Sequence, residues 1–329
     1  MKRTIFLVIL FVLGVSISCF SSQKTILVIE SYDSGYPWDI SYKKGIESVL
    51  AKDYNIVYFE MDTKRLPPDQ YEKRAQLAYE MYKKNQPVLV ILGDDNALKF
   101  VGPKLSDTKT PVVYLGINNN PRDYGLSQSE NITGILERPL MKRSIIYISE
   151  LIEPKLEKML ILFDSGNTSK ISVREMFNDK ASVSVSGVQV DLQLIGKLSD
   201  WKKAVLSARM NGYGAIVVGL YQTIVDENGK HVSADEIIDW TSKNTLVPPF
   251  GFWDFTVGKD LTIGGLVLFG QTQGEEAATI ALEILSGKKP NQIPPVMGKK
   301  GRFFFSRSQL AKWQITLPDH MASKADYTE

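Results

Sequence analysis

The sequence has one cysteine and two histidines in 329 residues, and this scarcity excludes several kinds of site. Cys19 lies in the N-terminal segment, so a chain that loses this segment has no thiol and no disulfide. His231 and His320 lie in polar, turn-like surroundings. With no second thiol and no paired histidines, we expect no zinc site, and we expect both histidines to be solvated surface residues.

An excess of charge of one sign is also missing. The chain has 39 Lys and Arg residues and 37 Asp and Glu residues, with no basic block. Binding of nucleic acid depends on the neutralisation of phosphates by clustered basic residues, so we expect no nucleic-acid partner.

Three motifs of catalysis and cofactor binding are absent as well. The chain has no G-x-G-x-x-G after a strand, no G-x-x-x-x-G-K-[ST] and no G-x-S-x-G. We therefore expect no nucleotide cofactor and no enzymatic activity.

The N-terminal residues have the pattern of an export signal. Lys2 and Arg3 precede an apolar run over 5–17, and small residues follow it. We predict a signal peptide over 1–22 and a periplasmic or otherwise exported protein. Ser18 precedes Cys19, as a lipoprotein signal requires, whereas cleavage after Ser21 would remove the cysteine; both alternatives remain open.

Strand and helix patterns then alternate along the chain. Buried strands are expected at 25–30, 54–62, 87–95 and 111–119, and again at 158–166, 188–196, 214–223, 248–255 and 264–270. Helical patterns lie between them, including one that leaves the first strand near Ser41. This alternation predicts an α/β protein with parallel sheets, and its restart predicts two similar lobes.

In open α/β sheets, the ligand site lies at the carboxyl ends of the strands. Aromatic and polar residues are concentrated there, most of all in residues 31–38. Aromatic faces can stack on a ligand ring, although packing within a lobe is an equal alternative, and Asp and Asn can also cap helices. The candidate ligand-binding residues are Ser31, Tyr32, Tyr36, Trp38, Asp94, Asp95, Asn96, Asn118, Asp164, Tyr221, Trp253 and Asp254.

Asp94 and Asp95 follow the third strand directly. Two adjacent carboxylates could hold a hard cation. We favour a division of roles instead, in which one carboxylate faces a ligand amine or hydroxyl and the other caps the helix that begins near Asn96.

Several stretches resemble the type I periplasmic binding proteins. They are "ESYDSGYPWDISYKKGI", "VILGDDNALKFV", "PVVYLGINN", "NITGILE" and "EEAATIALEILSGKKP", which span nearly the whole chain in the expected order. More narrowly, the chain resembles ABC-transporter substrate-binding proteins, some of whose relatives bind aromatic amino acids. It also resembles the periplasmic sensor portions of certain histidine kinases.

The resemblance implies two Rossmann-like lobes with parallel sheets, joined by a hinge of three crossings near 133–139, 260–265 and 295–302. The N-lobe would comprise 24–136 and 265–297, the C-lobe 137–264 and 298–320, and 321–329 would be a polar tail. The implied function is that of a monomeric exported protein that captures a small ring-bearing or amine-bearing ligand between its lobes and delivers it to an ABC permease. The alternative is a ligand sensor that docks on a membrane histidine kinase.

Overall fold

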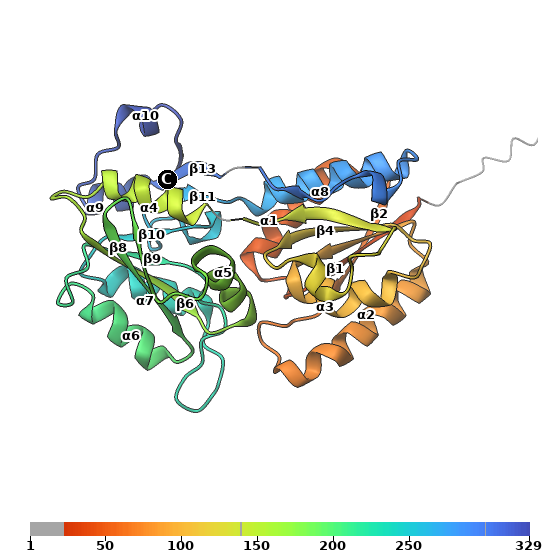
Figure 1. Cartoon of the computed structure of the whole chain (residues 1–329), viewed down its shortest axis with the longest axis horizontal. Helices are drawn as coiled ribbons and strands as arrows, with labels where there is room; N and C mark the ends of the chain where they lie inside the picture. Colours follow the sequence, from red (N-terminus) through yellow and green to blue (C-terminus); the bar gives the residue numbers. More distant parts are fainter. Residues whose placement is uncertain (1–22, 139, 300) are drawn as a thin grey trace, which may run out of the picture.

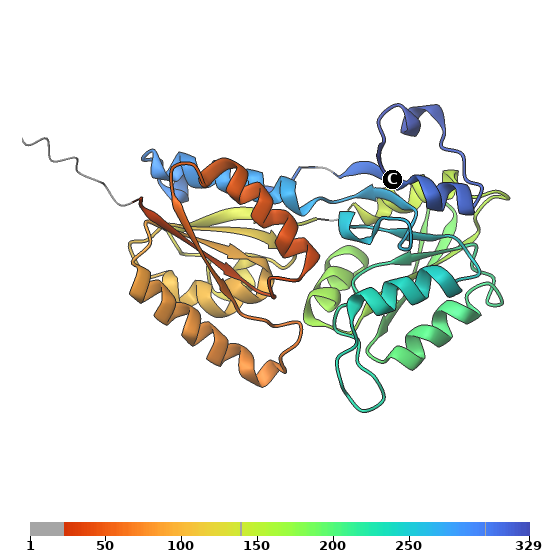
Figure 2. The same cartoon turned by 180° about the vertical axis from the view of Figure 1, so that it is seen from behind.

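The computed structural model describes residues 23–138, 140–299 and 301–329, and the expected signal peptide with Cys19 lies outside these residues. The chain folds into two α/β lobes that lie side by side and are joined along one edge (Figures 1 and 2). This architecture confirms the predicted fold class. Within the described ranges, no helix has the length and apolar character needed to cross a membrane.

The lobe that contains the first strand, called the N-lobe, is built on a parallel sheet with the order β12-β5-β4-β3-β1-β2. Its elements are β1 (Thr25–Glu30), α1 (Pro37–Leu50), β2 (Asn55–Glu60), α2 (Tyr71–Asn85), β3 (Leu89–Gly93), α3 (Asp94–Leu105), β4 (Val112–Ile117), β5 (Ile132–Leu136), α8 (Gly270–Leu285) and β12 (Val296–Met297), with short 3-10 turns at Pro68–Gln70, Pro121–Tyr124 and Pro290–Gln292.

Helices cover both faces of this sheet, which explains why its strands are apolar throughout. Alternate residues of β1 point to opposite faces. Ile26 and Val28 pack in the core beneath α1 and α8, whereas Leu27 and Ile29 pack in the core beneath α2 and α3. A strand buried on both sides therefore has no polar alternation.

The second lobe, called the C-lobe, contains a sheet with the order β10-β9-β6-β8-β7, in which β7 is antiparallel to β8 and the other pairs are parallel. Its elements are α4 (Met141–Glu150), β6 (Lys158–Asp164), α5 (Asn167–Phe177), β7 (Ser182–Val185), β8 (Val188–Ile195), α6 (Leu198–Ser207), β9 (Ala215–Val218), α7 (Ala234–Asn244), β10 (Pro249–Gly251) and a 3-10 turn at Asp254–Thr256.

A small sheet with the order β11-β13-β14 extends the C-lobe. It comprises β11 (Gly264–Val267), β13 (Arg302–Ser306) and β14 (Asp326–Thr328), with α9 (Arg307–Lys312) and α10 (Asp319–Ala322) between the last two strands. The chain passes between the lobes after β5, between β11 and α8, and between β12 and β13 (Figure 1).

Two predicted boundaries need correction. The second crossing was expected at 260–265, but β11 stays with the C-lobe and pairs antiparallel with β13. A side chain at Gly264 would collide with the carbonyl oxygen of Phe304, so this glycine permits a close strand pairing and does not mark a hinge. Residues 321–329, expected as a polar tail, include β14, whose backbone pairs with β13. The pairing of β14 uses backbone groups, so the polar side chains of this segment gave no sign of a strand.

The helix after β1 begins four residues earlier than its pattern predicted, at Pro37 instead of near Ser41. Proline is favoured in the first turn of a helix because its missing N–H would have no helical partner there. Trp38 consequently lies in the first turn of α1, where it is buried.

Helices α1 and α8 pack with their backbones in direct contact. A side chain at Gly45 would collide with the Gln271 carbonyl oxygen, and one at Gly274 would collide with the Tyr42 carbonyl oxygen. These two glycines therefore fix the separation between the helices, and with it the position of the segment that begins α1.

We predict that Gly274→Ala destabilises the protein. In an exposed helix this change stabilises by up to about 1 kcal/mol, but here the added methyl group meets backbone, and overpacking costs about 1–3 kcal/mol. Thermal unfolding should therefore show a melting temperature lowered by several degrees. Lys44→Ala, at an exposed position of α1, is the control and should change it little. A melting temperature raised by Gly274→Ala would contradict the close packing.

Candidate functional site

Hydrogen bonds join the two lobes directly. The Tyr32 hydroxyl, on the loop after β1, lies 3.0 Å from Thr168 Oγ1 in the first turn of α5. Further along α5, Ser172 Oγ donates to Asn118 Oδ1 at 3.3 Å. The strand ends of the N-lobe thus contact α5 of the C-lobe, and the structure is a closed arrangement of the two lobes.

A row of aromatic rings continues across this junction. The ring of Tyr32 meets Tyr36 edge to face, with 4.6 Å between the centroids. Tyr36 in turn lies 6.0 Å from Phe255 of the C-lobe, and Phe255 stacks on Trp253 at 6.3 Å. Both lobes therefore contribute rings to one contiguous cluster, in which Tyr32, Tyr36 and Trp253 are buried.

Asp94 is a buried and incompletely compensated polar group at the junction. It is 2 % exposed and has a φ of 70°, in the left-handed region that side chains seldom adopt. Its Oδ1 accepts a hydrogen bond from the Tyr32 hydroxyl at 3.4 Å, but its Oδ2 is buried without a partner. Burial, together with the charge of Glu137, holds the pKa of Asp94 well above its usual range. Backbone strain and an unsatisfied buried acceptor together mark a functional group.

The neighbouring Asp95 is fully occupied. Its carboxylate accepts hydrogen bonds from the backbone N–H groups of Asn118 and Asn119, both at 3.0 Å, and from the Tyr124 hydroxyl at 2.9 Å. Asp95 therefore anchors the loop after β4 and does not cap α3. The described residues contain no group of three His, Cys, Asp or Glu side chains that could hold a metal ion.

Ser31 performs the capping role that was expected of an aspartate. Its Oγ accepts a hydrogen bond from the Ala97 N–H at 2.8 Å and donates to the Gly93 carbonyl oxygen at 2.6 Å. Both of these groups belong to the turn from β3 to α3. Ser31 thus stabilises the turn that presents Asp94, and it has no hydroxyl free for a ligand.

Glu137 is a second buried carboxylate, at the first crossing between the lobes. Its Oε1 accepts a hydrogen bond from Trp253 Nε1 at 2.7 Å. Burial raises its pKa to about 8, despite the opposing effect of the Trp253 hydrogen bond. Glu137 orients the Trp253 ring and places a second buried carboxyl group near Asp94.

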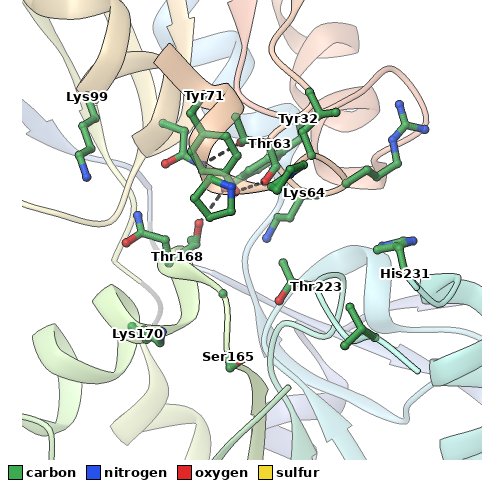
Figure 3. A pocket seen from close by; sticks show the side chains of 18 of the residues that line it. Tyr32, Thr63, Lys64, Tyr71, Lys99, Ser165, Thr168, Lys170, Thr223 and His231 are labelled. Carbon is green, nitrogen blue, oxygen red and sulfur yellow. Dashed lines mark hydrogen bonds between the residues drawn. The ribbon is translucent and has the colours of Figure 1, made fainter. Parts of the chain in front are cut away.

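A groove of about 730 Å³ opens between the lobes beside this junction (Figure 3). Tyr32 and Thr168 line it (Figure 3), and the Tyr32 hydroxyl donates to Asp94, which does not itself line the groove. The remaining lining consists mainly of hydroxyl, amide and basic side chains, among them Lys64 and Asn96. The groove therefore leads from solvent to Tyr32, whose hydroxyl contacts Asp94.

Three further predicted residues have partners within the protein. Asn96 Nδ2 donates to Thr63 Oγ1 at 2.8 Å at the edge of the groove. Asp164 accepts hydrogen bonds from Gly166 N and Thr223 N, both at 3.0 Å, and from the Ser169 hydroxyl. Asp254 accepts one from the Ser41 hydroxyl at 3.2 Å across the lobes, and burial raises its pKa to about 6. Asp164 and Asp254 thus stabilise turns and the lobe junction.

The structure places two candidate aromatics away from the groove. Tyr221 packs in the C-lobe core with Trp201 and Ile237 because it points to the face of the sheet that α6 and α7 cover. Trp38 is buried in the core to which α1 and α8 contribute. Their positions near strand ends were correct, but their side chains face the cores.

The sequence did not single out four residues of the junction: Lys64, Glu137, Thr168 and Phe255. Thr168 and Phe255 lie in strand-end segments that were predicted to face the ligand, so their position carried a signal. Lys64 and Glu137 follow no motif and reach the junction through the folding of a loop and of a crossing.

Comparisons with known proteins agree with this architecture. The profile of a family described as "ABC transporter substrate binding protein" matches residues 41–329. A search of curated proteins found no match.

Solved structures of similar fold have low sequence identity. A Streptococcus pneumoniae ABC domain in complex with L-Trp has a TM-score of 0.69 and 16 % identity, covering 93 % of this chain and 99 % of that chain. A Vibrio cholerae conserved domain protein has a TM-score of 0.67 and 16 % identity, with coverages of 94 % and 100 %. A Clostridium difficile substrate-binding protein with adhesive properties, in a ligand-free, open structure, has a TM-score of 0.64 and 12 % identity, with coverages of 93 % and 99 %.

We predict that Glu137 makes the closed form of the protein less stable toward unfolding as the pH rises. Its folded pKa of about 8 exceeds its ordinary value of 4.5. Below pH 4.5, Glu137 is protonated in both the folded and the unfolded protein, so its contribution to stability is fully present. Between the two values the unfolded chain loses the proton while the folded protein keeps it, so the free energy of unfolding falls. Glu137→Gln should lose less stability over this interval in urea titrations at several pH values.

Glu157→Gln, which changes an exposed carboxyl, is the matched control and should keep the pH profile of the parent. If the Glu137→Gln profile also follows that of the parent, the carboxyl of Glu137 does not titrate as its burial requires.

Proposed function

The chain belongs to the ABC transporter substrate binding protein family, and we propose that it is an exported receptor that captures a small amine-bearing, ring-bearing solute between its lobes. Delivery to an ABC permease is part of the proposal and follows from the family. The signal-peptide pattern of residues 1–22 supports export to the periplasm.

The observation that carries the proposal is the buried carboxylate of Asp94. Its Oδ2 has no partner, and burial keeps its pKa high although the charge of Lys64 acts to lower it. An ammonium group placed beside this oxygen would supply both a donor and a positive charge. Charge-assisted hydrogen bonds of this kind are about twice as strong as neutral ones. A ligand with an amine therefore removes the largest unfavourable term in the closed junction.

The aromatic cluster supports the second part of the proposal. Tyr32, Tyr36, Phe255 and Trp253 present ring faces and edges from both lobes next to Asp94. Such rings stack on a flat ligand and attract a cation through their π-faces. The Streptococcus pneumoniae protein of similar fold binds L-Trp, a molecule that has both a ring and an amine.

Binding requires the lobes to separate and close again. The Tyr32–Thr168 hydrogen bond closes the passage between the groove and Asp94. Three crossings of the chain form the hinge, and a few residues at such crossings can absorb the rotation of one lobe against the other. We propose that the solute enters the open form and takes its place between Tyr32, Asp94 and the C-lobe aromatics.

Asp94→Asn tests the proposed role of the carboxylate. A thermal-shift screen with pairs of ligands, such as tryptamine with tryptophol and phenethylamine with phenethyl alcohol, first identifies a bound amine. Calorimetry should then show that Asp94→Asn weakens the amine about 10-fold to 100-fold, in line with the 1.5–3 kcal/mol of a hydrogen bond to a charged group. The alcohol should lose little affinity.

Asp95→Asn is the matched control. It removes the charge of the adjacent carboxylate, which already accepts hydrogen bonds from the loop after β4. It should lower the melting temperature and leave the affinity near that of the parent. Equal affinities of the parent and Asp94→Asn for every bound amine would refute the role of Asp94.

We also predict that the free protein is more open in solution than the liganded protein. Closure without a ligand buries the Asp94 and Glu137 carboxyl groups with too little positive charge near them, which disfavours the closed form. Small-angle scattering should give a smaller radius of gyration with saturating ligand. An unchanged radius, with binding established by calorimetry, would contradict closure around the ligand.

A further inference from the structure

Lys64 is a nearly buried cation whose charge acts to lower the pKa of Asp94 but which is not paired with it directly. Its side chain is 9 % exposed, and it forms no ion pair and no hydrogen bond within the described part of the chain. Its Nζ lies 4.6 Å from the ring centroid of Tyr32 and 5.3 Å from that of Tyr36. Figure 3 shows the ammonium group pointing into the groove between the lobes. A desolvated lysine aimed into a groove favours an anion there.

The first turn of α5 faces Lys64 from the C-lobe. This helix spans Asn167–Phe177, and its N-cap residue, Gly166, provides no side chain to cap the free N–H groups. The Thr223 hydroxyl also lines the groove and is buried without a hydrogen-bond partner. Unused N–H groups at a helix N-terminus bind oxyanions, and the Thr223 hydroxyl offers one more donor.

The basic side chains that line the groove give its lining a net positive charge. No carboxylate lines it, whereas Lys64, Lys99 and Lys170 do, and none of these three lysines forms an ion pair with the residues that the structure describes. Arg65 also lines the groove, but it is paired with Asp62 at 2.7 Å. A group with one negative charge would leave most of this charge uncompensated, so the groove is better matched to a dianion.

The nearby carboxylate of Asp164 does not occupy the proposed position. It already accepts hydrogen bonds from Gly166 N, Thr223 N and the Ser169 hydroxyl. Its negative charge opposes an anion at the start of α5, which makes the positive charge of Lys64 the more necessary.

We propose that the groove between the lobes is a subsite for a tetrahedral oxyanion, held by Lys64, the N-terminus of α5 and Thr223. The solute would accordingly carry a phosphomonoester or phosphonate group at the end away from its amine. This second statement rests on the proposed function, because the amine end is placed at Asp94. Tyr32 lies between the two ends: Lys64 contacts its ring, and Asp94 accepts from its hydroxyl.

The test uses probes that share one amine and differ at the other end. Calorimetry at low salt measures inorganic phosphate, ethanolamine, β-alanine and O-phosphoethanolamine against the parent protein, Lys64→Gln and Lys83→Gln. Lys83 is the matched control, since its Nζ also lies over a tyrosine ring, Tyr79, at 5.3 Å, but it does not line the groove. Thr223→Val provides a second variant of the subsite that keeps every charge.

We expect phosphate to bind at one site per chain. Lys64→Gln should weaken phosphate binding at least 10-fold, whereas Lys83→Gln should bind phosphate with the affinity of the parent. Thr223→Val should weaken it several-fold. O-phosphoethanolamine should bind more tightly than phosphate, ethanolamine or β-alanine. Absence of phosphate binding, or equal binding by the parent and Lys64→Gln, would overturn the anion subsite.

The same probes separate this inference from the proposed function. If ethanolamine binds, Asp94→Asn weakens that binding, and phosphate does not bind, the amine site stands and the anion subsite is refuted. If phosphate binds through Lys64 but O-phosphoethanolamine binds no more tightly than phosphate, the anion subsite stands. The idea that one ligand reaches both Lys64 and Asp94 is then refuted.

Discussion

The closed arrangement depends on the burial of two carboxyl groups where the lobes meet. Asp94 and Glu137 are removed from water there, and burial raises the pKa of each. Direct hydrogen bonds between the lobes, such as Tyr32 with Thr168 and Trp253 with Glu137, offset only part of this cost. A cationic solute changes the balance because it stabilises the ionised carboxylate and replaces the missing water. The same charges that disfavour an empty closed form therefore favour a loaded one.

The sequence predicted the fold well because the signals for the fold are local. Apolar strands and amphipathic helices can be recognised within a few residues, and their alternation restricts the topology to parallel sheets. It also predicted the edge at which the candidate site residues lie, since strands of an open α/β sheet present their carboxyl ends at one edge. Tyr32, Asp94 and Trp253 follow directly from that rule. The small sheet of β11, β13 and β14 does not, because its strands are distant in sequence and pair through backbone groups.

The roles of individual residues at the strand ends could not be predicted in the same way. Ser31, Asp94, Asp95 and Asp164 all follow strands and all could cap a helix. What distinguishes them is which N–H groups lie within reach: Ser31, Asp95 and Asp164 are occupied by such donors, whereas Asp94 retains an unpaired oxygen. That difference depends on how separate loops meet in space. Lys64 joins the site for the same reason, by the folding of a loop that has no motif.

Tyr32 connects ligand recognition with the contact between the lobes. Its hydroxyl has one proton and lies between Asp94 Oδ1 and Thr168 Oγ1. Burial, followed by the charge of Asp94, raises the pKa of Tyr32 well above its usual range, so it remains a hydrogen-bond donor. When a cation ionises Asp94, the carboxylate becomes the stronger acceptor, and the Tyr32 proton turns toward it. The Tyr32 oxygen is then free to accept the Thr168 proton. In the proposed function, ionisation of Asp94 would thus order a chain of hydrogen bonds from the C-lobe to the ligand and would couple closure to binding.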